Sequence, residues 1–202
     1  EYRDVMRLGR KTRLPENSRA KLWSIFEIVH SKLKAKELIT NAVMYDELSA
    51  WYVKKKSWPF DFAIIDEAQD INPSQLRFLA AMGGEKPNSL FFTGDLGQRI
   101  FQPPFSWKKL GVDIRGRSRT LRVNYRTSHQ IRMQADRLLG PEISDVDGNI
   151  ETRTGTISVF NGPKPTIIVL DSKNREIEAV GQWIVDRNNE SINPHEIGVF
   201  VR

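Results

Sequence analysis

The sequence predicts an α/β fold with a parallel sheet, flanking helices and a helical region before the sheet. Two short apolar runs, Phe62–Ile65 and Ser89–Thr93, have the composition of buried strands. A segment with helical spacing lies between them, and strand, helix and strand within about thirty residues form a βαβ unit. The first run ends abruptly at Asp66 and Glu67, and the second ends at Gly94-Asp95. In parallel sheets, the functional residues lie just past the carboxyl ends of the strands.

Helical periodicity dominates roughly the first 55 residues. Apolar side chains recur there at spacings of three and four, which predicts a core-facing stripe: Leu22, Ile25, Phe26, Val29 and Leu33. After the first predicted strand, Asn72-Pro73-Ser74 predicts a helix start and Gly83-Gly84 predicts its end.

The second half of the chain predicts alternating strands and helices. Leu121 and Val123 have strand spacing, and Thr127-Ser128 is expected to cap a helix. Further strands are expected at Thr156–Phe160, Thr166–Leu170 and Ile197–Val201, with an amphipathic helix over 174–188.

Composition limits the classes of protein that the chain can be. With 202 residues, 39% hydrophobic and 28% charged, it can form one good core or two small ones. No apolar run approaches the roughly 18 residues that cross a bilayer, so we expect no membrane partner. The absence of cysteine excludes disulfides and thiolate metal sites and favours a cytoplasmic protein.

Positive charge is concentrated in two zones of a chain whose net charge is +6. Residues 1–36 hold ten Lys/Arg against four Asp/Glu, and residues 99–137 hold ten against two. Such zones favour contact with a polyanion, either nucleic acid or a triphosphate. A solvated surface is the alternative, with equal weight for the first zone.

Two adjacent carboxylates, Asp66 and Glu67, follow the first apolar run. An aspartate there can hold the magnesium of a bound nucleoside triphosphate, and a neighbouring glutamate can activate water. The plainer interpretation is an acidic helix start. No G-x-x-x-x-G-K-[ST] phosphate loop occurs; Gly9-Arg10-Lys11-Thr12 fails because position 4 is Asp4.

Three motifs follow one another along the chain: Asp66-Glu67-Ala68-Gln69, Gly94-Asp95-Leu96-Gly97-Gln98-Arg99-Ile100-Phe101 and Leu121-Arg122-Val123-Asn124-Tyr125-Arg126-Thr127. In order and spacing they resemble motifs II, III and IV of superfamily 1 helicases of the UvrD/Rep type. The resemblance implies RecA-like parallel sheets and an incomplete P-loop NTPase core. It places a helical accessory subdomain at 1–58, the second half of one RecA-like domain at 59–120, and the start of another at 121–202.

The resemblance implies catalytic roles that make physical sense. Asp66 would bind Mg²⁺, and Glu67 would orient and deprotonate the attacking water, with Gln69 at the nucleotide site. Gln98 would sense the γ-phosphate of ATP, and Arg126 would act as an arginine finger. The alternatives are a tight turn at Gly94-Asp95 and a surface ion pair for Arg126.

Aromatic and basic residues would contact ligands in the same scheme. Tyr125 would stack on adenine, and Phe101 would stack on a DNA base, with Arg99 and Trp107 as further nucleic acid contacts. For Phe101 and Trp107, packing in the core or at an interface is the alternative, and for Trp107 it is the better one. The family often has a tryptophan where this chain has Pro103. A stacking platform would then be rebuilt around Phe105 and Trp107.

Three arginines at alternating positions have strand spacing and would lie on one face, where they could track phosphates or be solvated: Arg115, Arg117 and Arg119.

The function implied is that of a fragment of an ATP-dependent DNA helicase or translocase. It would couple ATP hydrolysis to 3′-to-5′ movement on single-stranded DNA, with single-stranded or duplex-junction DNA and ATP as partners. Because the phosphate-binding lysine is missing, we expect the isolated chain not to hydrolyse ATP. The alternative is a degenerate helicase-like module that binds nucleic acid or a partner protein without ATPase activity. A two-metal nuclease is disfavoured, since further carboxylates and a nearby lysine are missing.

Overall fold

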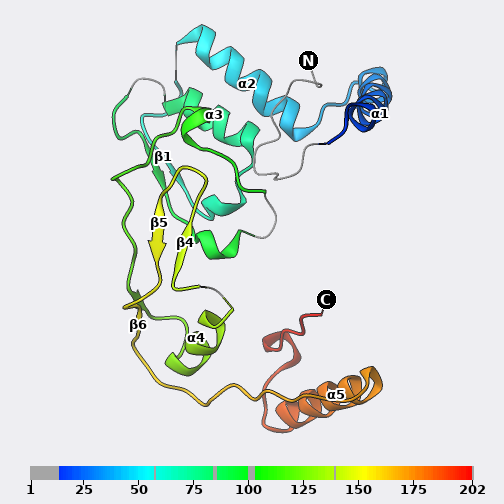
Figure 1. Cartoon of the computed structure of the whole chain (residues 1–202), viewed down its shortest axis with the longest axis vertical. Coiled ribbons are helices and arrows are strands. Elements are labelled where there is room, and N and C mark those ends of the chain that lie inside the picture. Colours follow the sequence, from blue (N-terminus) through cyan, green and yellow to red (C-terminus); the bar gives the residue numbers. More distant parts are fainter. Residues whose placement is uncertain (1–13, 57, 84–85, 100–102, 139, 202) are drawn as a thin grey trace. The chain divides into compact units, whose positions relative to one another are not determined.

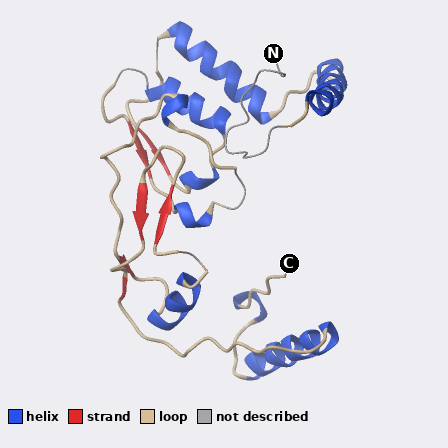
Figure 2. Cartoon of the chain, viewed as in Figure 1, coloured by secondary structure: helices blue, strands red, loops and turns tan. Residues whose placement is uncertain are grey.

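The computed structural model describes residues 14–56, 58–83, 86–99, 103–138 and 140–201. The chain divides after Gly162 into two compact units. Helices and small parallel sheets make up the described part, and this composition fits an α/β fold (Figures 1 and 2). The domain boundaries expected from the sequence, at 58/59 and 120/121, stay predictions.

Two helices open the first unit, α1 (Glu16–Ala35) and α2 (Asn41–Lys55), as the periodicity predicted. The side chain of Thr40 caps α2 by accepting a hydrogen bond from the Val43 N–H. The predicted core-facing stripe of α1 is wrong in this structure. Leu22, Ile25 and Val29 are 37%, 55% and 45% exposed, because the core of the unit forms around α3 and the sheet instead.

A βαβ unit follows, as predicted. Strands β1 (Ala63–Ile65) and β2 (Leu90–Phe92) pair in parallel, and α3 (Pro73–Gly83) connects them. Helix α3 begins where the sequence predicted, because Asn72 and Gln75 exchange backbone-to-side-chain hydrogen bonds around Pro73. A short 3-10 helix, Ala68–Asp70, lies between β1 and α3.

The core lies on one face of the β1–β2 sheet. Its buried members come from segments that precede and follow β2 in the sequence: Ala68, Ile71, Leu76, Phe105, Trp107 and Val112. The rings of Phe92 and Trp107 meet edge to face with centroids 4.9 Å apart. The opposite face of the sheet is open, with Ile64 79% and Phe91 61% exposed. Helix α2 lies beside α3, and Tyr45 of α2 contacts Phe78 of α3 (Figure 1).

A second parallel pair joins β3 (Val123–Asn124) to β6 (Ile157–Ser158), and α4 (His129–Asp136) lies between them in sequence. Ser128 caps α4, as predicted. An antiparallel hairpin that the sequence analysis did not predict lies in the same segment: β4 (Glu142–Ser144) and β5 (Ile150–Thr152). Short 3-10 helices occur at Leu96–Gln98 and Lys108–Leu110.

The second unit contains α5 (Lys173–Asn189), as predicted, and a 3-10 helix, Pro194–Glu196. The strands expected at Thr166–Leu170 and Ile197–Val201 are wrong here, since both segments are loop (Figure 2). A strand needs a neighbour for its backbone hydrogen bonds. Both segments instead expose their apolar side chains, such as Val169 at 92% and Phe200 at 96%. Among the described residues, no helix has the length and apolar character that crossing a bilayer requires.

Candidate functional site

The acidic pair follows β1 directly. Glu67 has φ 50° and ψ 43°, a left-handed conformation that residues other than glycine rarely adopt. The plainer interpretation, an acidic helix start, is met in part, because Glu67 is the N-cap of the 3-10 helix Ala68–Asp70, although α3 begins only at Pro73. Asp66 and Glu67 are exposed and line a pocket of about 390 Å³. The rest of its lining comes from β1, α2 and the Asp70–Leu79 segment.

Asp66 is held as an anion. The hydroxyl of Thr93 and the backbone N–H of Glu67 both donate to its Oδ1. These two hydrogen bonds hold the pKa of Asp66 below its ordinary value of 3.8, and the bond from Thr93 has the larger effect. No hydrogen bond to Oδ2 is found within the described residues. This oxygen is therefore placed to accept a cation or a solvent donor.

The donor set suits magnesium better than a metal held by protein ligands alone. The described residues contain no group of three or more His, Asp or Glu side chains with ligand geometry. Mg²⁺ commonly keeps several waters and binds one or two carboxylates together with substrate phosphates. The ionised carboxylate of Asp66, which lines the pocket together with Glu67 and Asp70, fits this pattern.

Gln69 joins the two loops that follow β1 and β2. Its side chain is 5% exposed, donates from Nε2 to Glu67 Oε2 at 2.7 Å, and accepts at Oε1 from the Asp95 N–H at 3.0 Å. The backbone supports the same junction, since the Ala68 N–H donates to the Thr93 carbonyl at 2.8 Å. A Cβ on Gly94 would lie 2.7 Å from Gln69 Oε1, so only glycine allows this approach.

The Gln98 loop begins at Asp95, whose carboxylate organises it. Oδ1 accepts the Gly97 N–H at 2.7 Å, and Oδ2 accepts the Gln98 side-chain amide at 3.0 Å. The tight turn that the sequence left open is thus present. It also fixes the amide of Gln98, which is exposed at the end of the short 3-10 helix. Asp66, Glu67, Gln69 and Gln98 therefore belong to one hydrogen-bonded edge of the sheet.

Tyr125 and Arg126 lie on a turn after β3. The side-chain oxygen of Asn124 accepts the N–H groups of Arg126 and Thr127 at 2.9 and 3.0 Å. This turn presents both side chains to solvent, with Tyr125 75% exposed. Within the described part of the chain, the Arg126 guanidinium makes no ion pair or hydrogen bond. The structure therefore gives neither a surface ion pair nor a contact with the acidic pair.

The expected nucleic acid residues have different surroundings. Phe101 lies outside the described residues. The Arg99 guanidinium lies 5.9 Å from the ring centroid of buried Phe105. Burial of the guanidinium lowers the pKa of Arg99. Trp107 is only 6% exposed, so its ring is part of the core and is not open to a base. For Trp107, the core alternative describes the structure, because the ring packs against Phe92.

The three alternating arginines do not lie on a strand. Arg115 and Arg117 lie in a turn, and no strand includes Arg119. Arg115 pairs with Asp113 at 2.6 Å, which lowers the pKa of that carboxyl to about 2, and Arg117 donates to Asn88. These contacts replace the single face that the spacing predicted.

Several residues at the site escaped the sequence analysis. Thr93 ends the second predicted strand beside Gly94, which is a local signal for a role next to Asp66. The hairpin carries its own signal, Asp147-Gly148, since an Asp-Gly pair between short β segments predicts a tight turn. Glu151 and Arg153, which contact the Gln98 loop, carry no local signal.

Residues 11–108 match the UvrD/REP helicase N-terminal domain family. The matched range contains the acidic pair, Gln69 and the Gln98 loop, and it ends before Tyr125 and Arg126. The match supports a UvrD-like helicase fragment and a helicase-type function. No curated protein was found to match the chain.

Proposed function

We propose that this chain is part of an ATP-dependent helicase that couples ATP hydrolysis to 3′-to-5′ movement on single-stranded DNA. One observation carries the proposal. The hydrogen bonds Glu67–Gln69–Asp95–Gln98 join an acidic pair to a glutamine loop at the carboxyl ends of two parallel strands. An NTP-driven motor needs a carboxylate that holds Mg²⁺, a carboxylate that activates water and a residue that contacts the γ-phosphate. In parallel sheets, such residues lie at the carboxyl ends of the strands. The UvrD/REP match covers all four.

The geometry supports a role for each side chain. Asp66 would hold Mg²⁺, which when bound neutralises phosphate charge. Glu67, kept in place by Gln69, would orient the attacking water and accept its proton. Gln98, presented by Asp95, would contact the γ-phosphate of ATP.

Two exposed side chains on the turn after β3 would complete the nucleotide site. Arg126 would neutralise charge that develops on the γ-phosphate. Tyr125 would stack on adenine, because its ring is open to solvent. Motif IV is the assignment that we propose for this turn.

The RecA-like core that we propose is incomplete within these 202 residues. The sequence contains no phosphate loop, and the second face of the β1–β2 sheet exposes Ile64 and Phe91. Parallel sheets ordinarily have both faces covered. Turnover therefore requires a phosphate-binding lysine from outside this sequence. The 202-residue chain alone is expected to lack ATPase activity, and Mg²⁺-dependent turnover that disappears in Glu67→Gln would contradict this.

The test is ATPase activity stimulated by single-stranded DNA in the full-length protein. Glu67→Gln should lower turnover by about 10²- to 10⁴-fold and retain ATP binding. Arg126→Ala should lower it by about 10³- to 10⁵-fold with ATP binding also retained. Glu178→Gln, an exposed change on α5, is the control and should keep the wild-type rate.

Unchanged rates in both site variants would refute the proposal. A wild-type protein that binds DNA without any ATPase activity would instead support the binding-only module. Unwinding of duplexes with 3′ or 5′ single-stranded tails tests the direction of movement, and the proposal expects activity only with the 3′ tail.

A further inference from the structure

The β4–β5 hairpin is fastened to the segment that carries Gln98 at two places. At its tip, the Asp147 carboxylate accepts hydrogen bonds from the Ser106 hydroxyl and from the N–H groups of Trp107 and Lys108, the last two at 2.7 and 3.0 Å. On β5, Glu151 Oε2 accepts the Leu96 N–H at 3.3 Å. The hairpin therefore contacts the chain both before and after Gln98.

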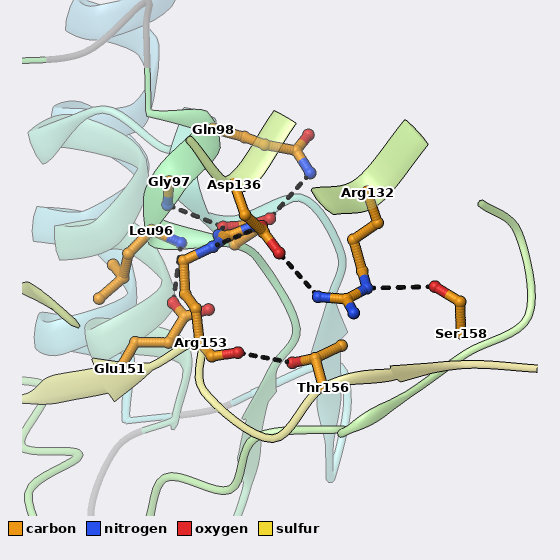
Figure 3. A network of polar contacts seen from close by, with 10 residues as sticks. Leu96, Gly97, Gln98, Arg132, Asp136, Glu151, Arg153, Thr156 and Ser158 are labelled. Atoms are coloured by element: carbon orange, nitrogen blue, oxygen red, sulfur yellow. Dashed lines mark hydrogen bonds and ion pairs between the residues drawn. The ribbon is translucent and has the colours of Figure 1, made fainter. Parts of the chain in front are cut away.

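Arg153 follows β5 and bridges two carboxylates (Figure 3). Its Nη1 lies 3.4 Å from Asp95 Oδ1, and its Nη2 lies 3.2 Å from Asp136 Oδ1. The side chain is 23% exposed, and those of Asp95 and Asp136 are 31% and 24% exposed. Ion pairs with this degree of burial are screened less than surface pairs. A planar guanidinium can also hold two acceptors in fixed directions.

The far end of the bridge is anchored in α4. Asp136 Oδ2 accepts from Arg132 Nη1 at 2.7 Å, and Arg132 Nε donates to Ser158 Oγ of β6 at 3.1 Å. Helix α4 begins directly after the turn that presents Tyr125 and Arg126. The polar network in Figure 3 thus runs from the Gln98 amide through Asp95 and Arg153 to the helix behind that turn.

We propose that Arg153 is a positioning residue for Gln98. It fixes the Asp95 carboxylate through Oδ1, so that Oδ2 holds the Gln98 amide in one orientation, and it ties this arrangement to α4 through Asp136. This inference rests on the proposed function, in which Gln98 contacts the γ-phosphate. A shift of α4 would then be passed to Gln98 through two partly buried ion pairs.

Arg153→Met tests the inference, because methionine keeps much of the aliphatic packing and removes both ion pairs. In the full-length protein, it should lower DNA-stimulated kcat by about 2- to 30-fold, the range for residues that couple sites, with KM for ATP unchanged. Arg153→Lys should recover part of the loss, since an ammonium can still pair with a carboxylate. Arg77→Met is the matched control, because Arg77 forms a single exposed ion pair with Asp46.

Amide hydrogen exchange of the Leu96–Gln98 segment gives a second measurement that does not depend on activity. We expect faster exchange there in Arg153→Met and unchanged exchange in Arg77→Met. Unchanged exchange in Arg153→Met would overturn the inference, as would faster exchange with a wild-type kcat. A wild-type protein without DNA-stimulated ATPase would overturn the proposed function, and the catalytic part of this inference with it, whatever the exchange rates.

Discussion

Gln69 donates a hydrogen bond of 2.7 Å to the carboxylate of Glu67, a residue whose backbone is left-handed. The same side chain accepts the Asp95 N–H, so one buried amide sets both the glutamate and the start of the Gln98 loop. A strained backbone is kept only when its surroundings fix it, and such strain is common at functional sites. The contact explains how two loops from different strands form one site.

Replacing Gln69 should affect both stability and turnover. Gln69→Leu keeps a similar volume but leaves the Asp95 N–H without its acceptor, so the free energy of unfolding should fall by about 1–3 kcal/mol. ATPase activity should fall as well, because Glu67 loses its donor. Urea unfolding and the DNA-stimulated ATPase assay measure the two effects. Gln182→Leu, on the surface of α5, should stay within about 0.5 kcal/mol of the wild type. Wild-type stability and turnover in Gln69→Leu would contradict the role of this bridge.

Gly94 should tolerate no side chain. Gly94→Ala places a Cβ 2.7 Å from Gln69 Oε1 and 3.1 Å from the backbone nitrogen of Ala68. We expect a loss of about 1–3 kcal/mol in the free energy of unfolding, since the strand-end loops must separate. In Gly140→Ala the new Cβ meets only the Glu142 carbonyl at 3.6 Å, an ordinary contact, and little change is expected. Equal stability of the two variants would show that the loops move apart easily.

Trp107 should behave as a core residue. Trp107→Ala is expected to lower the free energy of unfolding by about 3–5 kcal/mol, because the ring is 6% exposed and packs against Phe92. Trp107→Phe should lower the free energy of unfolding by a smaller amount. The affinity of the folded protein for single-stranded DNA, measured by fluorescence anisotropy, should not change in Trp107→Phe. A weaker affinity with wild-type stability would instead support a stacking role.

Asp147 should make the hairpin contact sensitive to acid. Burial raises the pKa of Asp147, but hydrogen bonds from Ser106 and from the N–H groups of Lys108 and Trp107 outweigh it, so the pKa lies below 3.8. A carboxyl with a lowered folded-state pKa adds stability above its unfolded-state pKa and loses this as pH falls through the folded value. Asp147→Asn should therefore be less stable than the wild type at pH 7.

Unfolding measured from pH 7 down to pH 2 tests this dependence. The difference between the wild type and Asp147→Asn should shrink below pH 3.8, the ordinary value of the carboxyl. Asp61→Asn, which removes an exposed pair with Lys86, should differ little from the wild type at any pH. A constant difference for Asp147→Asn across the range would rule out the charge as its cause.

Local sequence patterns were enough to predict the two parallel strands whose carboxyl ends carry the candidate site. A short apolar run ending in Asp66-Glu67, with a helix and a second run after it, predicted the parallel β1–β2 pair, and the structure confirms it. The cap at Ser128 and helix α5 were equally local. The chemical roles of Asp66, Glu67, Gln98 and Arg126 remain predictions.

The sequence by itself determined where β1 and β2 end, the start of α3, the cap of α4 at Ser128 and the order of the motifs, because these depend on residues a few positions apart. Only the tertiary structure decided that Gln69 joins Glu67 to Asp95, that Trp107 is core, and that Arg153 reaches Asp95 across 58 positions. It also decided that Thr166–Leu170 is loop, since strand propensity gives no ladder without a neighbouring strand. Contacts between distant segments depend on how the elements pack, and no local pattern encodes that packing.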